Sequence, residues 1–161
     1  MPYLQVDLPN HYPLETKRGL AKRMGDLWAE IMQTTPDLVD VGFRELGEGN
    51  VWRCGLDVPE PTAVILLELR SGRPTEQRAR VAQALIDECA KAFDLRPDQF
   101  TVEFTQHSND ESYRDVFIDG AFHGGFPPAW TPDEANYRSM LDAAPELGAQ
   151  SQSFQAPQPS A

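Results

Sequence analysis

The chain has 161 residues, 40% of them hydrophobic, and a formal net charge of −11. This length allows one domain with its own core, with or without a tail. The acidic balance excludes nucleic acid and anionic lipid as good partners, because both are polyanions. No apolar run approaches the roughly 20 residues of a membrane span, and the start lacks the basic and apolar parts of a signal peptide, so we expect a cytoplasmic protein.

The first half of the chain predicts a strand, a helix and two further strands. Residues 2–8 alternate loosely, as a short strand does. Residues 14–33 carry one apolar stripe at helical spacing. Its members are Leu20, Met24, Leu27 and Ile31. Residues 39–46 alternate again, and 51–56 follow a glycine-rich turn as a short returning strand.

The second half repeats this order about 60 residues later. Residues 62–69 form a nearly continuous apolar run, which is typical of a strand covered on both faces. A helix is predicted over 75–93 and a strand over 99–105. We also expect a short strand at 115–119, and a last short helix at 132–142. A loop containing Gly124, Gly125, Pro127 and Pro128 is expected between them.

The repeat predicts an α+β fold in which two β-α-β units, at about 2–56 and 62–106, form one four-stranded sheet with two helices on one face. The other face, expected to be apolar and bare, predicts self-association. We divide the chain into a domain at 1–125, an extension at 126–144 and a flexible tail at 145–161. The tail is rich in Gln, Ser and Pro, which is typical of low-complexity segments.

Pro2 is the first candidate for chemistry, because removal of Met1 would expose its secondary amine. Burial and nearby cations lower the pKa of an amine, so that it can exchange protons with carbon near pH 7. Arg70 and Arg73 follow the strand that corresponds to the Pro2 strand, and their planar guanidinium groups suit a carboxylate. The alternatives are a proline that only directs methionine removal and a solvated turn bearing two arginines.

These features together resemble the tautomerase superfamily. The features are the Pro2 start, the doubled strand–helix–strand, Gly49-Asn50-Val51, and Leu69-Arg70-Ser71-Gly72-Arg73. The most similar group is that of cis-3-chloroacrylic acid dehalogenase, and the resemblance covers roughly residues 2–125. It implies a tautomerase (MIF-like) fold, a homotrimer, an amino-terminal proline as acid or base, and Arg70 with Arg73 as the carboxylate ligands.

Three positions depart from the pattern of the dehalogenases. Trp28 stands where they carry a histidine, and Glu103 where they carry a tyrosine. Arg114 falls near the place of their water-activating glutamate, with Asp115 beside it. Hydrolytic dehalogenation needs a group that activates water, whereas tautomerisation needs chiefly the proline and an anion site. Each departure also has a structural alternative: Trp28 in the core, Glu103 facing solvent from its strand, and Asp115 in a turn.

The sequence therefore predicts a tautomerase that acts on a small 2-oxo or unsaturated carboxylate, with Pro2 as general acid/base. The alternatives are a hydratase or dehalogenase of 3-haloacrylates, a decarboxylase of a 3-oxo acid, and a non-catalytic assembly protein that retains Met1. We expect no cofactor and no metal site, because the acidic residues are scattered. The two cysteines are expected to be reduced thiols, and all three histidines (His11, His107 and His123) are expected in loops.

Overall fold

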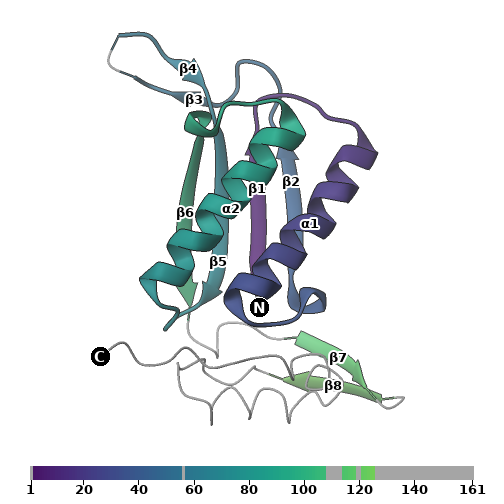
Figure 1. The fold of residues 1–161 in the computed structure, drawn as a ribbon. Coiled ribbons are helices and arrows are strands. Elements are labelled where there is room, and N and C mark those ends of the chain that lie inside the picture. Colours follow the sequence, from purple (N-terminus) through teal and green to yellow (C-terminus); the bar gives the residue numbers. More distant parts are fainter. Residues whose placement is uncertain (1, 56, 108–113, 119–120, 126–161) are drawn as a thin grey trace.

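Two strand–helix–strand units build the main body of the protein, as the doubled pattern predicts (Figure 1). The computed structural model describes residues 2–55, 57–107, 114–118 and 121–125. The first unit consists of β1 (Tyr3–Leu8), α1 (Leu14–Met32) and β2 (Asp40–Glu45). The second consists of β5 (Ala63–Arg70), α2 (Thr75–Phe93) and β6 (Phe100–His107). These bounds agree with the predicted elements to within two residues.

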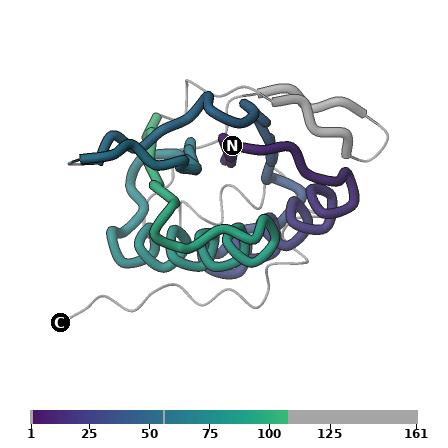
Figure 2. Tube along the Cα trace, turned by 90° about the horizontal axis from the view of Figure 1, so that it is seen from above, coloured from purple at the N-terminus to yellow at the C-terminus, as the bar shows by residue number. Residues whose placement is uncertain are grey.

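One mixed four-stranded sheet joins the two units, with the strand order β2-β1-β5-β6. Within each unit the two strands are parallel, and β1 pairs with β5 in the antiparallel direction. Both helices lie on the same side of this sheet (Figure 2). The predicted α+β architecture is confirmed.

The two helices begin and end in the same way. Each follows a proline with an extended conformation, Pro13 before α1 and Pro74 before α2, and proline cannot continue a helix backward because it lacks an N–H. Each ends at a residue with left-handed backbone, Gln33 and Asp94, whose N–H bonds to a carbonyl of the last turn. Because both helices begin after a proline, a local signal, their bounds could be predicted well from the sequence.

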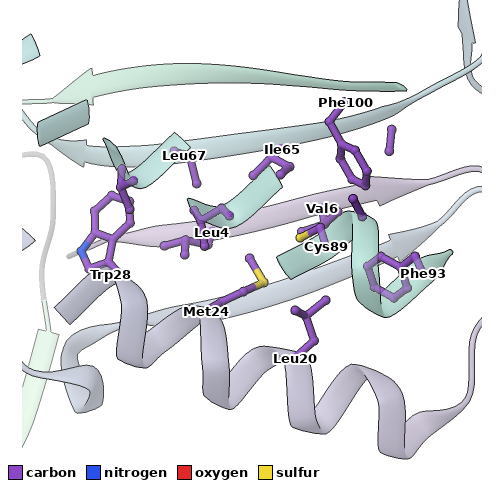
Figure 3. Close-up of a cluster of buried hydrophobic side chains, with 14 of the residues drawn as sticks. Leu4, Val6, Leu20, Met24, Trp28, Ile65, Leu67, Cys89, Phe93 and Phe100 are labelled. Carbon is purple, nitrogen blue, oxygen red and sulfur yellow. The ribbon is translucent and has the colours of Figure 1, made fainter. Parts of the chain in front are cut away.

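The core lies between the helices and one face of the sheet (Figure 3). Every second residue of β1 and β5 points into it, as the two-residue period of a strand requires. The largest fully buried side chains include Trp28, Leu4, Leu8, Met24, Met32, Ile65, Leu67, Leu69 and Leu85. The two amphipathic stripes predicted for the helices are therefore the faces that pack on the sheet.

The opposite face of the sheet, here called the open face, differs from the prediction. Neither helix of the described residues covers it, but most of its side chains are polar. Asp7 is only 7% exposed and accepts hydrogen bonds from Arg44 Nε at 2.7 Å and Gln5 Nε2 at 2.9 Å. The apolar run at 62–69 contributes only Val64 and Leu66 to this face, because its other apolar residues point into the core.

Two short hairpins complete the described chain. The predicted returning strand at 51–56 is β3 (Trp52–Arg53), which pairs with β4 (Glu60–Pro61) outside the main sheet. Arg53 holds this hairpin to β6 through the Phe100 carbonyl and the Thr101 hydroxyl. The position of the hairpin therefore depends on contacts with a distant strand, which the alternation of polar and apolar residues at 51–56 does not reveal.

The second hairpin pairs β7 (Arg114–Ile118) with β8 (Ala121–Gly125). The strand predicted at 115–119 agrees with β7, but Gly124 and Gly125, predicted in a loop, end β8. The helix predicted at 132–142 and the tail at 145–161 lie outside the described residues. Among the described helices, none is long and apolar enough to cross a bilayer.

Replacing Gly19 with Ala should raise the free energy of unfolding by about 0.5–1 kcal/mol, because glycine in a helix interior loses more backbone entropy than alanine. Gly19 lies on the exposed side of α1, and an added Cβ meets no atom within 4 Å. Urea unfolding measures the change. Gly47→Ala is the matched control and should destabilise, since Gly47 has φ +86°. Equal stability of the two variants would contradict the helix at residue 19.

Candidate active site

The chain enters β1 at the end of the sheet where β5 and β6 finish (Figure 1), and Pro2 is the residue before β1. Because β1 and β5 are antiparallel and Tyr3 pairs with Glu68, the next position outward places Pro2 opposite Leu69, the residue before Arg70. The Asp40 N–H donates to the Pro2 carbonyl at 3.2 Å, which fixes the first residue of the strand against β2. The sequence could not show this register, which brings together two of the predicted site residues.

Arg70 is the last residue of β5 and belongs to the open face. Its side chain is half-buried, and burial lowers the pKa of Arg70 to about 10, which leaves the group charged at pH 7. A cation that has lost part of its water binds an anion more strongly than an exposed one does. Arg70 thus places a half-buried positive charge at the end of β5; that it binds a carboxylate remains a prediction.

Arg73 has different surroundings. It is 9% exposed, and its Nη1 donates to the Met32 carbonyl at the end of α1. The structure therefore gives Arg73 a protein acceptor on a helix terminus. That Arg73 joins Arg70 as a second carboxylate ligand remains a prediction.

The other predicted positions are spread over the fold. Trp28 is 1% exposed in the core, near Leu4 and Leu67, so its structural alternative is confirmed (Figure 3). Glu103 is exposed in the middle of β6 and pairs with Leu66, away from the strand end that carries Arg70. Arg114 and Asp115 lie in β7, opposite Gly125 and Gly124, and their side chains are outside what the structure describes.

His107 is the polar residue that the sequence analysis left out of the site. It was expected in a loop, but β6 extends through it, and its Cα pairs with that of Arg70. The Ser71 N–H also donates to the His107 carbonyl at 2.9 Å. β6 pairs with all eight residues of β5 and therefore has the same length. The local sequence of β6 does not indicate that the strand extends to His107. Of the other two histidines, His123 lies in β8 and His11 lies outside every helix and strand.

The described residues offer no grouped metal ligands, and one of their two thiols is buried. They contain no group of three or more His, Cys, Asp or Glu side chains arranged to hold a metal ion. Cys54 and Cys89 are both free, and burial raises the pKa of the Cys89 thiol to about 12. A buried thiol of this kind is a poor nucleophile at neutral pH.

Comparisons with known proteins identify the fold. No protein-family model matches the chain, and no curated protein matches it in sequence. Among solved structures, a member of the cis-3-chloroacrylic acid dehalogenase (cis-CaaD) family is similar over 94% of this chain and 99% of its own, with a TM-score of 0.64 and 19% identity. Native fused 4-OT is similar over 74% of this chain and 94% of its own, with a TM-score of 0.59 and 23% identity.

A third similar structure is that of Pt0534 inactivated by 2-oxo-3-pentynoate. It has a TM-score of 0.60 and 19% identity, and the match covers 68% of this chain and 89% of that one. The identities are low, so these matches concern the fold. The protein therefore shares its fold with the 4-OT and cis-CaaD structures, as the sequence resemblance implied.

Arg70→Met should weaken the binding of a small carboxylate such as pyruvate by about tenfold or more, since a hydrogen bond to a charged group contributes about 1.5–3 kcal/mol. Isothermal titration calorimetry gives the Kd. The control is Arg96→Met, because Arg96 is an exposed arginine paired with Asp98 before β6 begins, at the opposite end of that strand. Both variants lose one positive charge, so equal effects would show that only net charge matters.

Proposed function

We propose that the protein is a tautomerase-type enzyme that uses the amine of Pro2, exposed by removal of Met1, as its general acid/base. The substrate is a small 2-oxo or unsaturated carboxylate, and the reaction is keto–enol tautomerisation. One observation carries the proposal: the antiparallel β1–β5 register, which brings the start of β1, just after Pro2, to the end of β5, where the half-buried Arg70 lies. The fold shared with 4-OT and cis-CaaD supports it.

The proposed reaction gives each group a role. Arg70 binds the carboxylate and leaves C3 of the 2-oxo acid, the carbon beyond the C2 carbonyl, next to the Pro2 nitrogen. The neutral amine takes a proton from C3 while the C2 oxygen gains a proton from water, which gives the enol; in the reverse direction the protonated amine returns a proton to C3 as the enol oxygen loses its own. The fixed charge of Arg70 disfavours a protonated amine beside it, so the pKa of Pro2 should lie below the value of about 8 of an ordinary terminal amine.

Pro2→Ala should slow the tautomerisation of phenylenolpyruvate by about tenfold or more while leaving the fold intact, because it replaces a cyclic secondary amine with a primary one. In the wild type, kcat/KM for the base-catalysed direction should rise with pH as the amine loses its proton, through a value below 8. Ultraviolet absorbance of the enol follows the rate. Wild-type rates from a folded Pro2→Ala chain would contradict the assignment.

A covalent probe gives a second test of the same residue. Pt0534 is inactivated by 2-oxo-3-pentynoate. A neutral Pro2 amine would add to the triple bond of this reagent, and a proton would move to the neighbouring carbon, so the chain would gain the whole mass of the reagent. Peptide mass spectrometry should place the adduct on Pro2. The intact mass before labelling shows whether Met1 is absent, and a retained Met1 would favour the assembly-protein alternative.

We further propose that the protein assembles as a homotrimer through the open face. One similar structure is described as a trimer of fused 4-OT, and the open face has no helix of the described residues over it. Light scattering should give three times the 18.0 kDa mass of the chain. Leu66→Lys, on the open face, should reduce this mass, whereas Gln83→Lys, on the exposed side of α2, should not. A monomeric wild type would rule out the trimer.

A further inference from the structure

Arg73 and Gln77 together close the end of α1. Arg73 Nη1 donates to the Met32 carbonyl, and Gln77 Nε2 donates to the Ile31 carbonyl at 3.2 Å. Both side chains are only 9% exposed. The last carbonyls of a helix have no partner inside the helix, and its C-terminus carries partial negative charge. A buried guanidinium at this place satisfies a carbonyl and is itself stabilised by the helix dipole.

This contact joins two segments that hold the candidate site. On one side, the chain leaves α1, passes through η1 (Pro36–Leu38) and reaches Asp40, whose N–H donates to the Pro2 carbonyl at 3.2 Å. On the other side, Arg73 follows Arg70 in the loop between β5 and α2. The Arg73–Met32 bond therefore lies between the segment that holds Pro2 and the loop that begins at Arg70.

We propose that Arg73 is a positioning residue that holds the end of α1 against the β5–α2 loop and so fixes Pro2 relative to Arg70. This inference rests on the proposed function of Pro2 and Arg70. It assigns the two arginines different roles: Arg70 binds the carboxylate, and Arg73 acts through the helix end. Proton transfer to carbon depends steeply on the geometry of the reacting groups, so a loosened contact lowers kcat more than it weakens binding.

The test compares Arg73→Met, Gln77→Met and the double variant, with Arg70→Met as the reference for a lost ligand contact. Arg73→Met should lower kcat by about tenfold but change KM by less than about threefold, whereas Arg70→Met should act mainly on KM. Gln77→Met should lower kcat in the same direction by a smaller factor. The melting temperature should fall in both single variants. In the double variant it should fall by less than the sum of the two single decreases, because both side chains donate to carbonyls at the same helix end.

Two outcomes would overturn the inference. A rise in KM as large as that of Arg70→Met, with unchanged kcat and melting temperature, would make Arg73 a carboxylate ligand. A Gln77→Met variant with a lower melting temperature but wild-type kcat would show that the helix end contributes to stability alone. If Arg73→Met does not fold, Arg73→Lys replaces it; lysine keeps one donor for the Met32 carbonyl and should retain most of kcat.

The melting temperatures separate a failure of this inference from a failure of the proposed function. The melting temperatures of the single and double variants measure the coupling between Arg73 and Gln77, and this measurement does not depend on enzyme activity. Full activity of Pro2→Ala would remove the proposed function and leave this coupling unchanged. If the decreases in melting temperature of the two single variants simply add in the double variant, the shared contact is refuted. If Pro2→Ala is inactive in the same experiments, the proposed function is retained.

Discussion

The antiparallel pairing of β1 with β5 is the constraint on which the rest of the molecule depends. Each β-α-β unit alone is a two-stranded parallel ladder with one helix, which has too little core to be stable. The pairing of Leu4 with Leu67 and Val6 with Ile65 fuses the two units into one sheet and one core. Because the two central strands run in opposite directions, the start of β1 must meet the end of β5.

That reversal makes the two ends of the sheet alike in backbone but different in chemistry. At one end, Tyr3 of β1 pairs with Glu68, two residues before Arg70, and at the other, Val64 of β5 pairs with Asp7. β5 begins in the middle of the chain, so it offers only a peptide group there. In a chain that has lost Met1, the end with Pro2 offers a free amine. The repeat thus contains two equivalent positions, the starts of β1 and of β5, and only the start of β1 can carry a free amine for acid–base chemistry.

The sequence predicted the elements better than the site. Both helices follow from their apolar stripes and from Pro13 and Pro74, which are local signals. Pro2 and Arg70 could be singled out by residue type and position. The bond of Arg73 to Met32 depends on how α2 packs against α1, and the strand position of His107 depends on its pairing with β5. Such features are set by contacts between distant segments, which one chain's local pattern does not encode.

Charge places a further limit on how such a site can work. The chain has a net charge of −11, so its overall field repels a carboxylate at long range. At physiological ionic strength this repulsion is largely screened beyond about 8 Å, whereas a contact with a half-buried group is screened much less. Arg70 is such a group, because it is half-buried at the end of β5. A carboxylate bound by Arg70, as proposed, would therefore be held by a short-range contact at the end of β5, the end of the sheet at which β1 begins.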